Sequence, residues 1–184
     1  MRELLRRYDM VGVVETHVDP ETARLLFFNK LQHGEAAADG AGGMVENQFF
    51  YQWGLVIGCK KKWAEKHKAR QVKVTKKGGV CFGIQWEIGD GRRGFFLIFH
   101  LDAAKESKRI AQLEEMGEWV TQHIAENDVV MYGGDRNFTT REDERMSNRR
   151  NIWRPSIKMN EAWTKWEMTS AAKKLDQPEF TWQK

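Results

Sequence analysis

The sequence predicts an α/β (α+β) protein in which helices cover β-sheets. Three observations lead to this class: short apolar, β-branched runs, glycine-containing turns between consecutive runs, and two long segments with helical spacing of apolar residues. Of the 184 residues, 41% are hydrophobic and 30% are charged, which is typical of a globular protein with a sizeable core. We expect one domain over residues 1–184, because no repeat or low-complexity linker divides the chain.

The first third of the chain predicts strands and helices in alternation. Residues 2–9 (RELLRRYD) suit a short amphipathic helix. Met10 to Thr16 (MVGVVET) is predicted as a buried strand, because it is short, β-branched and apolar on both faces. A second helix is expected to start at Asp19, which suits an N-cap and is followed by proline. Residues 49–59 (FFYQWGLVIGC) are strand-like, and a short helix or a basic excursion follows them.

The middle of the chain predicts three antiparallel strands. QVKVT, GVCFGIQWEI and GFFLIFHLDA are separated by glycine-containing turns, as expected of strands joined by hairpins. The clearest helix covers residues 105–127, in which apolar residues recur at helical spacing: Ile110, Leu113, Met116 or Gly117, Val120 and Ile124. A buried strand, DVVMYGG, is expected next, and a last helix near Pro155 precedes an extended C-terminal segment.

Composition limits where the protein could be located in the cell and which kinds of partner it could bind. The net charge of +4 and the pI of about 9.1 permit an anionic partner without requiring one. Cys59 and Cys81 have no second cysteine or histidine at zinc-site spacing, so we expect buried thiols in a reducing compartment. The N-terminal residues lack the apolar core of a secretory signal, and no run reaches the roughly 18 apolar residues of a membrane helix. We therefore expect an intracellular protein, nuclear or cytoplasmic, without a membrane partner.

Polar side chains follow three of the apolar strands. Glu15 closes the first strand, His100 closes the third strand of the antiparallel run, and Asp135 and Asn137 follow DVVMYGG. Sites in open α/β sheets gather at the carboxyl ends of strands, which makes Glu15 and Asp135 candidates for a shared site. An aspartate and an asparagine two residues apart suit a phosphate group beside a magnesium ion. A histidine can donate a proton or hold a phosphate oxygen.

Each of these residues also has an ordinary structural explanation. Glycine, aspartate and asparagine are common turn formers, so GGDRNF (residues 133–138) could be only a turn after a strand. Glu15 could be a solvated residue at a strand end, and His100 could be a packed core histidine. Taken one at a time, the residues leave both explanations open.

Taken together and in order, four motifs resemble the endonuclease/exonuclease/phosphatase superfamily, which includes pancreatic deoxyribonuclease and inositol-polyphosphate phosphatases. The motifs are VVETH, GGV at 78–80, IFHLDA and GGDRNF, and the closing AWTKW…LDQPEFTW is similar to retroelement-type members. The resemblance spans roughly residues 5–182. It implies a partial four-layer α/β sandwich, with two mixed or antiparallel sheets flanked by helices.

The resemblance also implies a function. It suggests metal-dependent cleavage of phosphodiester bonds in nucleic acid, DNA in preference to RNA, with Mg²⁺ or Mn²⁺ as cofactor. Glu15 would bind the metal, Asp135 would orient or deprotonate the attacking water, and Asn137 would hold the scissile phosphate. His100 would contact a phosphate oxygen or support the leaving group. The implied substrate contacts are His17, Arg136 and Arg141.

The chain also departs from the superfamily pattern. The family begins with a strand carrying an asparagine and ends with an SDH motif, whereas no SDH triplet occurs in this sequence. We therefore expect an incomplete domain, without the first strand and the C-terminal strands, and with weak or no activity. Arg136 stands where the family usually has an aromatic or apolar residue.

Two other classes of function stay open beside the hydrolase. One is a non-catalytic remnant or nucleic-acid-binding fragment of a retroelement, and the other is a phosphatase of small phosphorylated molecules. The basic residues 59–77 could neutralise backbone phosphates or form a solvated face. The eight tryptophans are mostly expected in the core, with Trp119 near the apolar face of its helix, although an exposed one could stack on a nucleobase.

Overall fold

The structure is a computed structural model that describes residues 2–17, 22, 37–38, 44–45, 47–75, 80–137 and 157–164. A three-stranded sheet has the order β1-β5-β4, with β1 at Met10–Val13, β4 at Asn47–Gln52 and β5 at Leu55–Lys60. A four-stranded sheet has the order β6-β7-β8-β9, formed by β6 (Arg70–Lys73), β7 (Cys81–Gly89), β8 (Arg92–His100) and β9 (Val129–Asp135). Two short strands, β2 (Ala37–Ala38) and β3 (Met44–Val45), pair separately. The described helices are α1 (Arg2–Arg7), α4 (Lys61–Lys66), α5 (Glu106–His123) and α6 (Ile157–Thr164).

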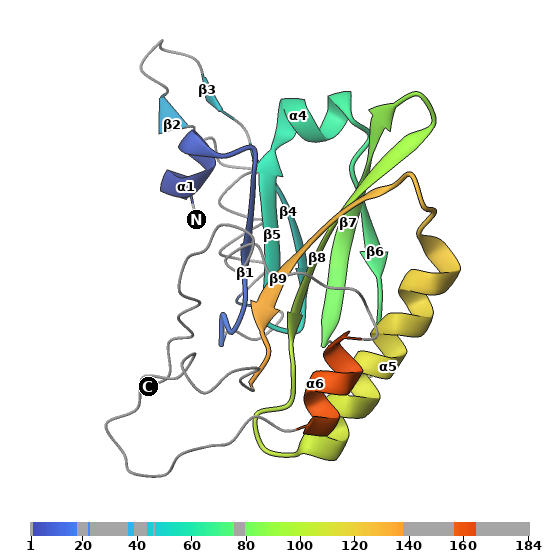
Figure 1. Cartoon of the computed structure of the whole chain (residues 1–184). Helices are drawn as coiled ribbons and strands as arrows, with labels where there is room; N and C mark the ends of the chain where they lie inside the picture. Colours follow the sequence, from blue (N-terminus) through green and yellow to red (C-terminus); the bar gives the residue numbers. More distant parts are fainter. Residues whose placement is uncertain are drawn as a thin grey trace, which may run out of the picture.

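The two main sheets lie face to face, and helices cover their outer faces (Figure 1). Ile57 of the smaller sheet and Ile98 of the larger one share a core between the sheets. On the outer side of the smaller sheet, Leu5 of α1 packs with Phe49 and Val56. On the outer side of the larger sheet, a third core joins β8 to α5 and α6, including Leu113. The predicted class, with two mixed or antiparallel sheets flanked by helices, is confirmed.

The side chains of β8 alternate between its two faces, so this one strand contributes to two hydrophobic cores. Phe95, Leu97 and Phe99 pack toward α5 and α6, whereas Phe96 and Ile98 pack toward the smaller sheet. A strand that is covered on both faces has apolar residues at consecutive positions, which explains the uninterrupted apolar segment FFLIF. Phe96 is only partly buried. Burying each of the other four side chains contributes about 1.5–3 kcal/mol. The same alternation places His100 on the face toward the smaller sheet.

A glycine lets β1 lie directly on β8. A Cβ at Gly12 would lie 2.7 Å from Cγ2 of Ile98 and 3.0 Å from Cζ of Phe96, closer than side-chain packing allows. The absence of a side chain therefore brings the end of β1 next to the end of β8. This contact positions the residues that follow Val13.

Residues 49–59, predicted as strand-like, form parts of two strands in the structure. The chain turns at Trp53 and Gly54, whose φ angles are 49° and 81°. Two consecutive left-handed residues are typical of the type I′ turn that joins antiparallel strands. The turn forms the hairpin of β4 and β5, and Gly54 is the sequence signal that predicts it.

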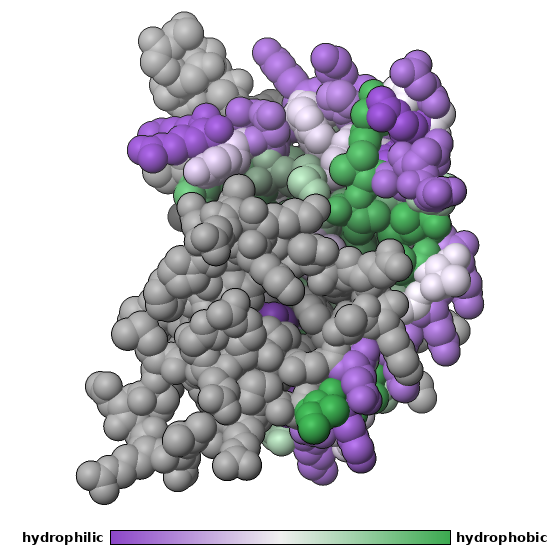
Figure 2. Space-filling model, in the orientation of Figure 1, coloured by the Kyte–Doolittle hydropathy of each residue, from purple (hydrophilic) through white to green (hydrophobic). Residues whose placement is uncertain are grey.

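The strand DVVMYGG is less buried than predicted. β9 stands last in its sheet, and Val129 and Met131 are 42% and 43% exposed. Val130 and Tyr132 pack on the core beneath α5. The opposite face of β9 is only partly covered, and hydrophobic surface is visible where β9 begins (Figure 2).

Other expectations have mixed outcomes. The three antiparallel strands are confirmed as β6, β7 and β8, and the long helix is confirmed as α5. The helix expected from Asp19 and the C-terminal extended segment lie outside the described residues. No helix in the described part of the chain is long and apolar enough to cross a membrane.

An ion pair joins the starts of β8 and β9. The Asp128 carboxylate, whose side chain is 1% exposed, accepts hydrogen bonds from Nε of Arg93 at 3.2 Å and from the amide of Ala125 at 2.8 Å. Arg93 also donates to the carbonyl of His123 at 2.9 Å, at the end of α5. The hydrogen bond from Arg93 lowers the pKa of Asp128, and its partner raises the pKa of Arg93. The pair therefore ties the helix end to both strands.

Acid should weaken this tie. Because the pKa of Asp128 is lower in the folded chain, its stabilisation is present above the ordinary aspartate pKa of about 3.9 and is lost as the pH falls through the depressed value. At pH 7, Asp128→Asn should lower the free energy of unfolding by about 2 kcal/mol, and the difference from wild type should close below about pH 4. Urea unfolding across this pH range measures both effects. The control is Asp9→Asn, whose exposed pair with Lys60 should contribute little; equal losses in both variants would contradict the assignment.

Two adjacent glycines in β9 should differ in their tolerance of alanine. A Cβ at Gly134, where φ is 152°, would overlap the backbone carbonyl of Phe99, whereas a Cβ at Gly133 would meet nothing within 4 Å. Gly134→Ala should therefore destabilise the chain by about 2 kcal/mol or more, and Gly133→Ala by less than about 0.5 kcal/mol. Chemical denaturation of both variants tests this; similar midpoints would show that β9 does not approach β8 so closely.

Candidate functional site

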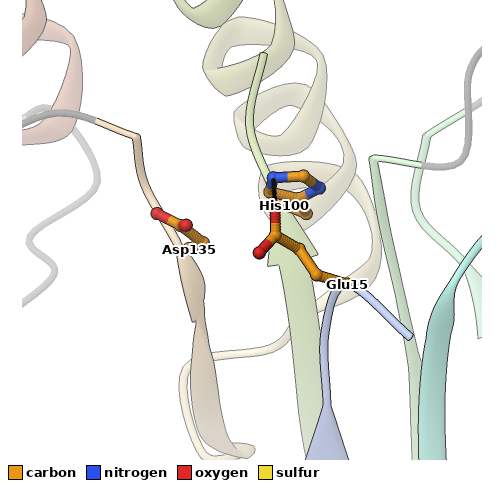
Figure 3. A group of neighbouring side chains, drawn as sticks. All are labelled: Glu15, His100 and Asp135. Atoms are coloured by element: carbon orange, nitrogen blue, oxygen red, sulfur yellow. Dashed lines mark ion pairs between the residues drawn. The ribbon is translucent and has the colours of Figure 1, made fainter. Parts of the chain in front are cut away.

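Three side chains from different strands meet at one end of the sandwich. Glu15 follows β1, His100 ends β8 and Asp135 ends β9, and the side chains lie close together (Figure 3). One potential ligand atom from each lies within 4.8 Å of the others. His100 and Asp135 are register partners in the parallel pair, so their strands end side by side. Glu15 reaches them from the opposite sheet, and the structure thus brings the predicted strand-end residues together.

His100 lacks the hydrogen bonding expected of a packed core histidine. Its Nε2 lies 3.1 Å from Oε1 of Glu15, an ion-pair contact when the ring is protonated. The approach does not have hydrogen-bond geometry, and this nitrogen is shielded from solvent without a hydrogen-bond partner among the described residues. A shielded polar atom without a partner costs free energy, which a ligand or proton at this position would recover.

Asp135 and Asn137 form a turn that closes the strand end. The Asp135 carboxylate accepts a hydrogen bond from the amide of Asn137 at 2.8 Å, and Nδ2 of Asn137 donates to the carbonyl of Leu101 at 2.7 Å. The amide of Leu101 donates to the carbonyl of Asp135 at 2.9 Å. The turn explanation is therefore correct, but it does not exclude a functional one. A carboxylate has about four acceptor positions, so the turn leaves Asp135 able to bind further groups.

The backbone at this site is strained. Glu15, His17 and Asn137 have φ angles of 55°, 48° and 54°, in the left-handed region that L-residues rarely adopt. Such conformations cost about 1–3 kcal/mol each and cluster at functional sites. Asparagine and histidine are among the residue types enriched in this region, whereas glutamate is not. The amide of Thr16 donates to the carbonyl of Gly54 at 3.0 Å, which holds the Glu15–His17 loop in place.

The donor set fits a divalent cation. The carboxylates of Glu15 and Asp135 lie within 4.8 Å of each other and repel when both are ionised. A cation between them removes this repulsion, and carboxylate oxygens are the protein ligands that Mg²⁺ and Mn²⁺ prefer. The shielded Nε2 of His100 gives the group a third donor or a contact to a bound anion. These residues could therefore hold a metal ion.

The other predicted substrate contacts are less well defined. His17 is exposed on the loop after Glu15, and the half-buried Arg136 follows Asp135, so both lie next to the cluster in the chain. Arg141 lies outside the described residues. Within the basic segment 59–77, Lys60 pairs with Asp9 at 2.9 Å and Lys68 with Glu87 at 2.8 Å, which favours a solvated face for these two lysines.

Both cysteines are inert at neutral pH. Cys59 and Cys81 are free and buried, as predicted. Burial raises the pKa of the Cys59 thiol to about 12 and also raises the pKa of Cys81. Neither thiol provides a nucleophile for the candidate site.

One supporting residue was missed in the sequence. The Asp102 carboxylate accepts hydrogen bonds from the amides of Ala104 at 2.9 Å and Lys105 at 2.7 Å. The bond from the Lys105 amide is the largest cause of its lowered pKa. Asp102 thereby fixes the chain between His100 and α5. A carboxylate three residues before a predicted helix is the signal that could have identified it.

No family model matches the chain, and no curated protein shows significant sequence similarity to it. Among solved structures, a truncated Caenorhabditis elegans TDP2 is similar with 21% identity and a TM-score of 0.45, over 78% of this chain and 55% of that one. A humanized D. rerio TDP2 has 16% identity and a TM-score of 0.47, over 75% of this chain and 53% of that one.

The inositol polyphosphate 5-phosphatase domain of SPsynaptojanin, in complex with inositol (1,4)-bisphosphate and a calcium ion, has 17% identity and a TM-score of 0.43. This similarity covers 71% of this chain and 43% of that one. The chain thus spans about half the length of the solved structures that it matches. At this level of identity the similarity concerns the fold alone.

A metal titration tests the donor set without measuring activity. Mg²⁺ or Mn²⁺ should raise the unfolding temperature of the wild type, because a ligand that binds only the folded chain stabilises it, by about 2.7 kcal/mol at 100 times Kd. Glu15→Gln and Asp135→Asn should reduce this shift, since each removes a charged ligand of the group. Glu87→Gln is the matched control, because Glu87 is an exposed acid that pairs with Lys68 instead. Equal shifts in all the variants would rule out a cation at this site.

Proposed function

We propose that this chain is a metal-dependent hydrolase that cleaves phosphodiester bonds in nucleic acid, DNA in preference to RNA. The observation that carries the proposal is the convergence of Glu15, His100 and Asp135 at one end of the sandwich, with Asn137 tied to the same turn. The order of the sequence motifs supports it independently. We also propose that the 184 residues are part of one domain of this type.

The chemistry of the ligands favours Mg²⁺ or Mn²⁺ as the cofactor. Glu15 is the most exposed acid of the group and would hold the ion through its carboxylate. When bound, the cation offsets the negative charge on the phosphoryl oxygens and so lowers the barrier to attack. Mg²⁺ needs only one or two protein carboxylates, because water and substrate oxygens complete its coordination. The two carboxylates of the cluster, Glu15 and Asp135, are therefore sufficient to hold the ion.

The remaining residues would divide the proton transfers and the binding of phosphate. Asp135, oriented by the amide of Asn137, would accept a proton from the water that attacks phosphorus. His100 would donate from Nε2 to a phosphate oxygen or to the leaving oxygen as the P–O bond breaks. Asn137 gives one N–H to Leu101 and would use the other for the scissile phosphate. The products are an alcohol and a phosphate monoester.

We propose that this polypeptide alone turns over slowly. The motifs that it resembles use the aspartate and histidine of an SDH triplet, and the 184 residues contain no such triplet. General acid/base catalysis typically contributes about 10²–10⁴-fold, so a rate reduced by that order is expected. The substrate would be contacted by His17 and Arg136 beside the cluster, and by Arg141. The similarity of the closing segment AWTKW…LDQPEFTW to retroelement-type members supports DNA as the target.

Nicking of supercoiled plasmid in the presence of Mg²⁺ tests the proposal. Slow, metal-dependent conversion to the open circle is expected, and Asp135→Ala should abolish it because the proton acceptor is lost. Glu87→Gln, purified in the same way, should nick at the wild-type rate, so that the loss can be assigned to Asp135. Equal nicking by Asp135→Ala would indicate a contaminating nuclease and contradict the proposal.

A substrate panel then separates the alternatives. Intact DNA, abasic DNA, RNA and inositol phosphates should be compared under one set of conditions. Faster release of phosphate from inositol phosphates would replace the nucleic-acid assignment with a phosphatase. Retained binding of DNA without any hydrolysis would instead indicate a non-catalytic binding fragment.

A further inference from the structure

Trp53 is exposed where folding gives no reason for a tryptophan. It occupies the turn between β4 and β5, its φ angle is 49°, and it is 70% exposed. A left-handed conformation and an exposed indole both cost free energy. No ring contact or side-chain hydrogen bond joins Trp53 to the described residues. By contrast, the rings of Trp86 and Trp63 contact each other in a tilted arrangement with centroids 5.6 Å apart, and Trp119 contacts Phe95 edge-on at 6.1 Å.

The turn that carries Trp53 is attached to the candidate site. The carbonyl of Gly54 accepts a hydrogen bond from the amide of Thr16 at 3.0 Å, and the amide of Gly54 donates to the hydroxyl of Tyr51 at 3.1 Å. Glu15 and Trp53 are therefore each one residue away from the same hydrogen bond. Figure 1 shows the β4–β5 connection at the same end of the molecule as the ends of β1, β8 and β9. Trp53 thus lies at the same end of the molecule as the cluster, on a turn that is fixed at two points.

We infer that Trp53 is a substrate-contacting residue whose indole stacks on a nucleobase next to the phosphate held at the cluster. This inference rests on the proposed function and specifies how the substrate is recognised. Stacking suits this position because every base presents a flat π-face, whereas an inositol ring does not. The turn is already ordered, so binding would cost little conformational entropy.

Stacking has a consequence for substrate choice. A base inside an intact duplex is already stacked on its neighbours and must be unpaired before it can contact Trp53. Single-stranded DNA, frayed ends or positions beside an abasic gap should therefore bind better than intact duplex. This preference for unpaired bases over intact duplex should depend on Trp53 and not on Glu15, His100 or Asp135.

The experiment measures binding without cleavage. Fluorescence anisotropy of a labelled oligothymidine in EDTA should show that Trp53→Ala binds about 5- to 150-fold more weakly than wild type. An oligomer of the same length made of abasic nucleotides should bind equally to both proteins. Trp53→Phe should have intermediate affinity. Tyr8→Ala is the matched control, because Tyr8 is 58% exposed but precedes β1 at the opposite end of that strand.

Trp53→Gly separates binding from folding. Glycine adopts the left-handed conformation without strain, so this variant should keep the β4–β5 turn and the urea midpoint while losing the same affinity as Trp53→Ala. Unchanged affinity for the oligothymidine in both variants would overturn the inference. So would an equal loss of affinity for the abasic oligomer, which would assign Trp53 to the backbone of the nucleic acid.

The outcomes also distinguish this inference from the proposed hydrolase. If the wild type cleaves DNA but Trp53→Gly shows an unchanged KM and affinity, the stacking role of Trp53 is contradicted and the proposed hydrolase function is supported. If base-dependent binding requires Trp53 but neither the wild type nor any variant cleaves a substrate with Mg²⁺, the stacking role is supported and the hydrolase function is contradicted.

Discussion

The parallel pairing of β8 with β9 is the constraint on which the candidate site depends. The register places His100 beside Asp135, and parallel strands present their carboxyl ends at the same edge. If β8 shifted by one residue along its neighbouring strands, His100 would turn toward α5 and leave the cluster. Gly134 permits the close approach at the site end, and Arg93 ties the other end to the loop before β9. The chemistry at one end of the sheet is thus held in register by an ion pair at the other.

Glu15 depends on a different interaction, the packing of one sheet on the other. No backbone hydrogen bond joins β1 to β8, and the contact is made where Gly12 leaves room for Ile98 and Phe96. Protein interiors are close-packed, so a shift of β1 on β8 would also move the start of the loop that carries Glu15. The cluster therefore requires the whole sandwich, because the β8–β9 pair alone supplies only two of its three side chains.

Local patterns predicted most elements, and non-local contacts explain what was missed. The strands and α5 were recognisable because periodicity and glycine turns act over a few residues, and the site residues because polar groups directly follow apolar runs. The parallel pairing of β8 with β9 and the partial exposure of Val129 depend on segments distant in sequence. The same holds for the hydrogen bond between Thr16 and Gly54, which joins the site to a turn 38 residues further along the chain. The functional roles of Glu15 and Asp135 stay predictions.

Left-handed residues occur at both ends of the molecule. At the end away from the cluster, the left-handed Asp90 precedes Gly91 in the β7–β8 hairpin, and aspartate and glycine are suited to that turn. Lys68, between α4 and β6, is also left-handed at this end. At the cluster end, the left-handed positions include Glu15 and Trp53, whose side chains do nothing to ease the conformation. Each costs about 1–3 kcal/mol, which the cores on both sides of β8 must offset. Glu15 and Trp53 adopt this conformation against local preference at the end where the candidate site lies, and strain of this kind supports the functional role proposed for that end.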